Sequence, residues 1–355
     1  MPAPFVTVLV DTYNHERFIE QAIGSVLKQD FPLSEAEILV VDDGSTDRTP
    51  DLVRRFEPRV RLLQKANGGQ ASAFNFGIEA AQGEIVAFLD GDDWWASNKL
   101  SHVVSEMRSD ASIGIVGHGI VIVHRDGRHE SETLREGFRF QADSLEGAKL
   151  LRRRGAFFGT SRMTIRRDVL RKIGAVPESI AVQADEYLFT IAAALAPARI
   201  LPESLTYYRY HDSNAFQLSD FDQAKLRHKQ TSLTALALAI DQRLQSEGID
   251  RSTREAILKY TRSSAVQLRL MLDGGWSWET AQTEWSLYQV THPDAPLLHR
   301  VFKLAVVLGT ALLPPRAFYR LHRKITQSGL YNRMRQHWLP IPEMAHLRKE
   351  TRTGS

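Results

Sequence analysis

Cysteine is absent from the sequence, which excludes disulfide bonds and thiolate metal sites and fits a reducing cytoplasm. A long apolar run is absent too. The most hydrophobic stretch, Val301 to Leu313, is shorter than the about 20 residues that a membrane-spanning helix needs. No basic leader precedes the first apolar segment, Phe5 to Val10, so we interpret that segment as a strand and not as a secretory signal. We therefore expect a cytoplasmic protein.

Net charge is small as well, at +3, but it is unevenly distributed. Hydrophobic residues make up 43% and charged residues 25% of the chain, as in ordinary globular proteins, so we expect a substantial core. Residues 299–355 hold eleven Lys or Arg against Glu343 and Glu350, whereas the front of the chain is not basic. Because no RNA- or DNA-binding module stands out either, nucleic acid is a disfavoured partner.

Short apolar runs alternate with helical patterns in the first part of the chain. Runs of strand length lie at 5–10, 38–41, 60–63 and 85–89, and apolar residues between them recur at helical spacing. Such β-α units with short connections predict a doubly wound, mostly parallel α/β sheet with right-handed crossovers.

Beyond Trp95 the pattern changes in two steps. Apolar runs at 113–116 and 120–123 predict two strands joined near His118 and Gly119. From Phe221 onward only long helical patterns remain. We therefore divide the chain into an α/β domain over 1–219, with a nucleotide-binding part of about 1–95 and an acceptor part of about 96–219, and a helical region with a basic tail over 220–355.

Three carboxylates within four positions follow the run that ends at Leu89, namely Asp90, Asp92 and Asp93. Carboxylates this close repel one another unless a cation neutralises them. Oxygen ligands without thiolates suit Mg²⁺ or Mn²⁺, which also bind substrate phosphates. The alternative is a solvated turn that caps the next helix through Asp93 or Ser97.

Similar polar clusters follow the other predicted strands. They lie at 11–14, 42–47 and 67–70, so together with 90–93 they form four clusters at strand carboxyl ends. In open α/β sheets this edge binds ligands. No Gly-x-Gly-x-x-Gly follows the first strand, which disfavours a dinucleotide-binding fold.

The order and spacing of these motifs resemble the family 2 glycosyltransferases, which have a GT-A fold. The resemblance covers roughly residues 5–215 and rests on Thr12-Tyr13-Asn14, Val41-Asp42-Asp43-Gly44-Ser45-Thr46-Asp47, Asn67-Gly68-Gly69, Leu89-Asp90-Gly91-Asp92-Asp93, the acidic pair before Leu188, and Tyr208-Arg209-Tyr210-His211. It implies a GT-A-type, Rossmann-like sheet and a metal-assisted transfer from a nucleotide-sugar, usually a UDP-sugar.

The resemblance also implies roles for single positions. Asp43 matches the carboxylate that accepts a hydrogen bond from the base, Asp90 lies on the ribose side, and Asp92 holds the metal. Asp11 replaces a proline that is frequent in the family. The implied nucleotide-sugar contacts are Thr12, Tyr13, Asn14, Glu16, Asp42, Asp43, Asn67, Gly68, Asp90, Gly91 and Arg209.

Two further sites follow from the chemistry. A departing diphosphate needs cationic donors, which Arg209 and His211 supply, with His211 also a candidate metal ligand; alternatively both pair with Asp212. The acceptor hydroxyl needs a base. The resemblance implies Asp185 for this role, because the family has an acid three residues before a leucine, here Leu188, and Glu186 is its rival. Alternatively, both acids only complement a helix dipole. Displacement opposite the diphosphate inverts the anomeric configuration.

The acceptor is a saccharide, lipid-linked molecule or protein that the sequence does not define. Residues 301–324 join the apolar run to a basic helix, which is typical either of peripheral contact with the inner face of a membrane or of a helix packed on the catalytic domain. Trp94, Trp95, Phe157 and Phe158 are candidates for stacking on sugar rings. A noncatalytic nucleotide-sugar-binding protein and a nucleotidyltransferase are the alternative functions.

Overall fold

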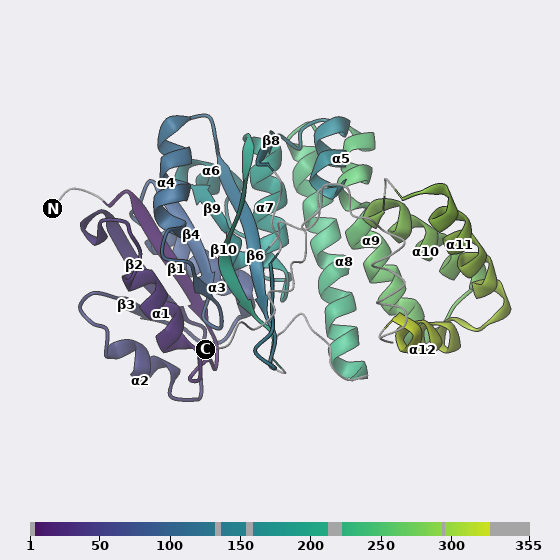
Figure 1. Ribbon diagram of the computed structural model, residues 1–355, viewed down its shortest axis with the longest axis horizontal. Helices are drawn as coiled ribbons and strands as arrows, with labels where there is room; N and C mark the ends of the chain where they lie inside the picture. The colour runs from purple at the N-terminus through teal and green to yellow at the C-terminus, as the bar shows by residue number, and fades with distance from the viewer. Residues whose placement is uncertain (1–3, 132–135, 154–158, 212–221, 293–294, 327–355) are drawn as a thin grey trace, which may run out of the picture.

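A computed structural model describes residues 4–131, 136–153, 159–211, 222–292 and 295–326 (Figure 1). The strands in chain order are β1 (Val6–Thr12), β2 (Ala36–Asp42), β3 (Arg61–Gln64), β4 (Ile85–Asp90), β5 (Trp94–Trp95), β6 (Ile115–Val123), β7 (His129–Ser131), β8 (Phe138–Phe140), β9 (Met163–Arg166) and β10 (Ala198–Arg209). The helices are α1 (Ile19–Leu27), α2 (Thr49–Arg54), α3 (Gly69–Ala80), α4 (Lys99–Ser109), α5 (Leu145–Arg153), α6 (Arg167–Ile173), α7 (Ala184–Leu195), α8 (Gln223–Ser246), α9 (Arg251–Asp273), α10 (Ser277–Thr291), α11 (Leu297–Gly309) and α12 (Pro315–Thr326).

The sheet follows the order β3-β2-β1-β4-β9-β6-β10-β5, with β7 added beside β6 and β8 beside β10. Strands β1 to β4 are mutually parallel, as are β6 and β10. Strand β9 runs antiparallel to its neighbours β4 and β6, and β5 runs antiparallel to β10. The predicted mostly parallel α/β sheet is therefore confirmed, and the carboxyl ends of β1 to β4 lie at one edge.

Two hydrophobic cores cover the two faces of the sheet. Val8 and Val10 of β1 pack with α1, α2 and α4, whereas Leu9 between them packs with α3, α6 and α7 on the other face. Successive strand residues point to opposite faces, so a strand that is apolar throughout is stable only when both faces are covered. This is the physical reason for the continuous apolar runs in the sequence.

A helical region follows the sheet along the long axis of the molecule (Figure 1). Helices α8 and α9 begin at Asp222 and Asp250, whose carboxylates accept hydrogen bonds from the first free backbone N–H groups. Leu233 and Leu236 of α8 belong to the same core as α7, so this region is packed onto the α/β part. The boundary that we predict near Ser219 and the tail from residue 327 lie outside the described residues.

One local prediction is wrong. Residues 113–123 do not form two strands with a turn at His118 and Gly119, because β6 is a single strand from Ile115 to Val123. Gly117 lies within it, where a Cβ would approach the Cδ1 of Ile200 to 3.0 Å. The glycine thus marks close packing between strands and not a turn.

A buried ion pair within the α/β part is hydrogen-bonded to the helical region. Glu186 in the first turn of α7 accepts a hydrogen bond from the Arg152 guanidinium of α5 at 3.2 Å and from the Thr261 hydroxyl of α9 at 2.6 Å. The Arg152 Nε donates to the carbonyl of Ile257, also in α9, at 2.5 Å. Burial of both charges makes the loss of either partner costly.

Replacing Arg152 by alanine tests this junction. We expect Arg152→Ala to lower the free energy of unfolding by about 3 kcal/mol, because the Glu186 carboxylate would remain buried without its cation. Urea unfolding followed by circular dichroism measures the change. Arg251→Ala is the control, since the Arg251–Glu255 pair is exposed and its loss should leave the unfolding midpoint in place. Equal effects of the two substitutions would contradict the assignment.

Candidate active site

Backbone hydrogen bonds align the loops that follow β1, β2 and β4. The amide of Asp43 donates to the Thr12 carbonyl at 2.9 Å, and the amide of Gly91 donates to the Asp11 carbonyl at 2.8 Å. The amide of Lys65, directly after β3, donates to the carbonyl of Asp42 at 3.1 Å. All four predicted polar clusters therefore lie side by side at the carboxyl edge of the sheet.

Side chains clasp the β1 loop to the β2 loop. Asn14 adopts a left-handed backbone conformation, with φ 55°, which asparagine tolerates better than most residues. The backbone N–H of Asn14 donates to the Ser45 hydroxyl at 2.8 Å, and its side-chain Oδ1 accepts from the backbone N–H of Thr46 at 2.8 Å. Glu16 accepts from Arg48 at 3.2 Å. Tyr13 is left exposed beside this clasp.

Asp43 organises the turn that precedes α3. Its carboxylate accepts hydrogen bonds from the amides of Gly68 at 3.0 Å and Gly69 at 2.7 Å, and from the ammonium of Lys65 at 2.8 Å. The neighbouring Asp42 is buried and accepts from the Ser45 amide at 3.2 Å. Both acids thus shape the edge at which the sequence predicts a nucleotide base.

Three carboxylates form the centre of the edge. One oxygen from each of Asp90, Asp92 and Asp93 lies within 4.8 Å of the others. Asp11 joins them, because it is the register partner of Asp90 across β1 and β4. Burial, followed by the charge of Asp92, raises the pKa of Asp11 to about 8. Burial and the charges of Asp11 and Asp92 likewise raise the pKa of Asp90 well above its usual value.

Two imidazoles face Asp92. The Nε2 of His211 lies 2.9 Å and the Nε2 of His15 lies 3.7 Å from Oδ2 of Asp92. Burial alone would raise the pKa of Asp92, but the hydrogen bond from His211 and the charges of both histidines outweigh it and lower the pKa. Gly91 permits this approach, because a Cβ there would lie 2.8 Å from Nδ1 of His15. Asp92 is therefore the acid of the cluster that is most readily ionised.

Asp93 has a different role from its neighbours. Its carboxylate accepts from the Ser161 hydroxyl at 2.7 Å and from the Arg209 amide at 2.9 Å, so it ties β4 to η2 (Thr160–Arg162) and β10. Helix α4 begins after Asn98 without a side-chain cap. The alternative in which Asp93 or Ser97 caps this helix is therefore wrong.

Arg209 is held between two aromatic rings. Its guanidinium carbon lies 4.7 Å from the centre of the Phe18 ring and 4.5 Å from that of Trp94. The Nε donates to the Asp92 carbonyl at 2.9 Å, and a terminal nitrogen donates to the Gln21 side chain at 2.6 Å. Arg209 thus fixes the backbone at Asp92. Asp212, the alternative partner, lies outside the described residues, as do Phe157 and Phe158.

The two acids at the start of α7 point to different environments. Glu186 is engaged in the buried pair with Arg152. Asp185 lies close enough to Asp11 and Asp90 for its charge to raise the pKa of both. Burial raises the pKa of Asp185 itself to about 6. Asp185 therefore faces the acid cluster, whereas Glu186 faces α5 and α9.

The donor set fits a hard divalent cation. Carboxylate oxygens dominate it, the imidazoles of His15 and His211 lie beside Asp92, and Oδ1 of Asp11 is buried without a hydrogen-bond partner. Buried oxygens of this kind normally have partners, and a cation would supply one and relieve the repulsion between the acids. Mg²⁺ and Mn²⁺ are the ions that such ligands suit.

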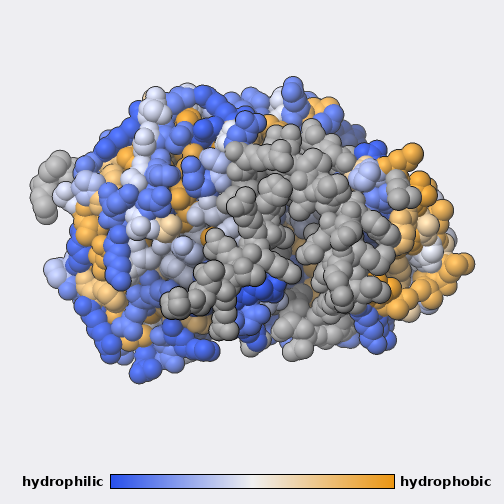
Figure 2. All heavy atoms as spheres, in the orientation of Figure 1, coloured by the Kyte–Doolittle hydropathy of each residue, from blue (hydrophilic) through white to orange (hydrophobic). Residues whose placement is uncertain are grey.

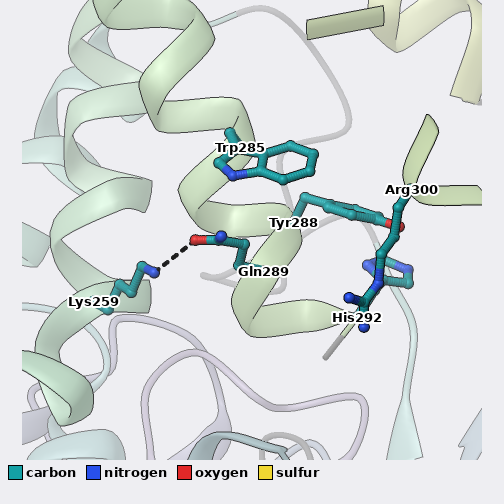
Figure 3. A pocket seen from close by; sticks show the side chains of 6 residues that line it. All are labelled: Lys259, Trp285, Tyr288, Gln289, His292 and Arg300. Carbon is teal, nitrogen blue, oxygen red and sulfur yellow. Dashed lines mark hydrogen bonds between the residues drawn. The ribbon is translucent and has the colours of Figure 1, made fainter. Parts of the chain in front are cut away.

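Two pockets lie away from these acids. One, of about 300 Å³, lies beside Trp94 and Trp95 and is bounded by residues of α1. The other, of about 340 Å³, lies within the helical region (Figure 3), where Lys259 donates to Gln289 at 3.0 Å. Its lining residues are Lys259, Trp285, Tyr288, Gln289, His292 and Arg300. Trp94 and Trp95, the candidates for stacking on a sugar ring, line the first pocket, whereas the residues predicted to contact the nucleotide are not among the residues that line either pocket.

Sequence reasoning missed three residues of the site. The position of Asp11 was accessible, because parallel pairing of the first and fourth strands places it beside Asp90. His15 and Ser161 carry no local signal. They reach the acids only through the fold, since Ser161 is 68 residues from Asp93 in the chain.

The sequence model of glycosyl transferase family 2 matches residues 7–174. An uncharacterized glycosyltransferase of Haemophilus influenzae is 31% identical over 169 residues, which cover 43% of this chain and 67% of that protein. An uncharacterized glycosyltransferase of Nostoc sp. is 33% identical over 214 residues, which cover 59% of this chain and 66% of that protein. The match therefore spans slightly less than two thirds of the Nostoc protein. It spans only 36% of a further relative, the uncharacterized glycosyltransferase EpsJ of Bacillus subtilis.

Solved structures share the fold at low sequence identity. S. aureus TarS 1–349, in complex with UDP-GlcNAc, superposes with a TM-score of 0.59 and 19% identity over 90% of this chain and 91% of that chain. Mannosyltransferase PcManGT from Pyrobaculum calidifontis, in complex with GDP-Man and Mn²⁺, gives a TM-score of 0.56 and 20% identity over 94% of this chain and 84% of that chain. The predicted GT-A-type sheet with a helical region after it is confirmed.

Removing the Asp11 carboxyl tests the repulsion within the acid cluster. With its pKa raised to about 8, Asp11 stays protonated in the folded, metal-free protein while the unfolded chain ionises near pH 4. Its ionisation therefore opposes folding increasingly between about pH 4 and about pH 8. We expect Asp11→Asn to raise the melting temperature in EDTA at pH 8 by at least about 2 °C, and by less at pH 5.

Differential scanning fluorimetry at the two pH values measures this effect. Asp51→Asn is the control, because Asp51 lies in an exposed pair with Arg54. A variant that is destabilised at pH 8 would refute the repulsion.

Proposed function

The chain belongs to glycosyltransferase family 2, and we propose that it transfers a sugar from a nucleotide-sugar, a UDP-sugar by preference, to a saccharide, lipid-linked or protein acceptor. The observation that carries this proposal is the group of acids at the carboxyl edge of the sheet, with Asp185 beside it. The transfer is assisted by Mn²⁺ or Mg²⁺ and inverts the anomeric configuration.

The nucleotide lies along the β1, β2 and β3 loops in this proposal. Tyr13 is exposed there and offers a ring to the base, while Asp43 and Gly68 set the shape of the neighbouring turn. Support comes from the two structural neighbours, which were solved with UDP-GlcNAc and with GDP-Man. Because their bases differ, the preference for UDP rests on the resemblance of the motifs.

Asp92 and His211 would hold the divalent ion, with Asp90 and Asp11 beside them. When bound, the ion neutralises the diphosphate and stabilises it as a leaving group. The Mn²⁺ in the structure of PcManGT supports this assignment. Arg209 holds Asp92 in place, because its guanidinium donates a hydrogen bond to the Asp92 carbonyl.

Asp185 removes the proton of the acceptor hydroxyl. The acceptor oxygen then bonds to the anomeric carbon while the bond from that carbon to the diphosphate oxygen breaks, and the electron pair leaves with the diphosphate. The proton moves to a carboxylate oxygen of Asp185. Attack from the face opposite the diphosphate inverts the configuration, and a base with a pKa of about 6 is ionised at neutral pH.

A cytoplasmic location and peripheral contact of residues 301–324 with the inner face of the cell membrane complete the proposal. No helix within the described ranges has both the length and the apolar character that crossing a bilayer requires. Helix α11 also exposes apolar residues instead of packing on the α/β part.

Replacing the metal ligand tests the function and the site together. We expect wild-type protein with Mn²⁺ to release UDP from a UDP-sugar. We expect Asp92→Ala to lose metal-dependent donor binding, because the variant lacks the carboxylate that faces His211. Isothermal titration with and without Mn²⁺ and a UDP-release assay measure the two effects. Binding without release favours a noncatalytic protein, and release of pyrophosphate favours a nucleotidyltransferase. Full activity of Asp92→Ala would remove this residue as the ligand.

Replacing the base tests the mechanism. For Asp185→Asn we expect unchanged donor affinity and a kcat lowered by a factor on the order of 10² to 10⁴. Wild-type kcat should rise with pH through about 6 and then level off, as the Asp185 carboxylate forms. Glu186→Gln is the matched comparison. If it alone removed this pH dependence, the role of base would pass to Glu186.

A further inference from the structure

One face of α11 is apolar and exposed. Leu297, Val301, Leu304 and Leu308 follow one another at intervals of four, three and four residues, which places them on one side of the helix. Their exposed fractions are 77%, 55%, 43% and 55%. Figure 2 shows apolar side chains gathered at the end of the molecule that α10, α11 and α12 form. A continuous exposed apolar stripe of this kind marks an interaction surface.

The stripe extends beyond α11. Leu312 follows in η3 (Thr310–Leu312) with 86% of its surface exposed. Trp276 and Trp278, at the start of α10, are 81% and 61% exposed. Ser277 between them donates a hydrogen bond to the Leu313 carbonyl at 3.3 Å, which places both tryptophans beside the end of the stripe. Tryptophan is enriched where protein meets the headgroup layer of a membrane.

The same segment carries charge of one sign. Residues 297–326 contain six Lys or Arg and no Asp or Glu. On α12, Arg320 and Lys324 are exposed next to Leu321 and Ile325, which are 49% and 48% exposed. Apolar and basic side chains therefore share the outer face of α12, as in helices that lie in the interface of an anionic bilayer.

We propose that the surface formed by Trp276, Trp278, the α11 stripe, Leu312 and the outer face of α12 docks onto an anionic lipid bilayer. This inference rests on the peripheral contact in the proposed function and specifies its residues, its lipid charge and its geometry. Helices α11 and α12 lie along the interface, with the leucines and tryptophans inserted and the basic side chains among the headgroups.

Charge selects the bilayer over two other occupants. A second copy of the chain would bring the same basic segment against itself. Residues 327–355 carry five Lys or Arg against two Glu, so this tail has the same sign as the surface as well. An anionic bilayer is opposite in charge and apolar beneath its headgroups, so it matches both properties of the surface.

The geometry has a functional consequence. The docking surface lies at one end of the long axis, whereas β1 to β3 lie at the other end (Figure 1). The docked protein therefore keeps its donor-binding half away from the bilayer, where soluble nucleotide-sugar can reach it.

Vesicle binding of the full-length protein tests the proposal. We expect wild-type protein to sediment with vesicles that contain phosphatidylglycerol and to bind pure phosphatidylcholine vesicles at least tenfold more weakly. We expect Leu304→Glu with Leu308→Glu to weaken binding at least tenfold, since two inserted side chains are lost. The double variant Arg320→Glu with Lys324→Glu should also weaken binding to the anionic vesicles about tenfold, but it should leave binding to pure phosphatidylcholine vesicles unchanged.

Leu238→Glu on α8 is the matched control, because Leu238 is 57% exposed but lies outside this surface. It should bind vesicles like the wild type. Circular dichroism checks that each variant is folded, as expected for substitutions at exposed positions.

Failure of wild-type protein to bind anionic vesicles, or an equal loss with Leu238→Glu, would overturn the proposal. The protein could instead self-associate without vesicles and lose this association in the variant Leu304→Glu with Leu308→Glu. That result would assign the surface to a second copy of the chain and would also overturn the proposal. UDP release from the soluble donor is measured in parallel without lipid. Lost release with intact vesicle binding counts against the proposed transferase only, and the reverse result counts against the docking surface only.

Discussion

Repulsion between carboxylates is the constraint on which the rest of this structure depends. Asp11 and Asp90 end neighbouring parallel strands, so the sheet itself forces their side chains together, and Asp92 and Asp185 add further charge. Burial prevents water from screening them. Burial and mutual repulsion therefore raise the pKa of Asp11 and Asp90, and a cation bound at this edge would lower both again.

The surrounding residues act mainly to hold this arrangement. Asp93 is tied to Ser161 and to the backbone of Arg209, and Arg209 in turn is packed between Phe18 and Trp94. Rigid positioning of this kind is what electrostatic catalysis needs, because a site that is already arranged need not reorganise during the reaction. Side chains that were expected to touch the diphosphate thus also have a supporting role.

The helical region is linked to the same chemistry. Glu186 faces Arg152 and Thr261, so the helix that presents Asp185 is anchored to α9 through the residue next to the proposed base. At the far end of the region, α11 and α12 expose their apolar and basic side chains. One continuous core runs from the sheet through α7 to α8 and α9. A separate small cluster packs Phe318 and Tyr319 of α12 against Leu270 of α9.

The sequence by itself determined the alternating α/β pattern, the edge at which its polar loops meet, and the acids at Asp90 and Asp92, because strand polarity and local spacing fix these features. Only the tertiary structure decided which neighbours those acids meet. His15, Ser161 and the separate surroundings of Asp185 and Glu186 depend on contacts between segments far apart in the chain. Periodicity reports which face of an element is apolar, but it does not report what covers that face. For this reason the exposure of α11 also had to come from the fold.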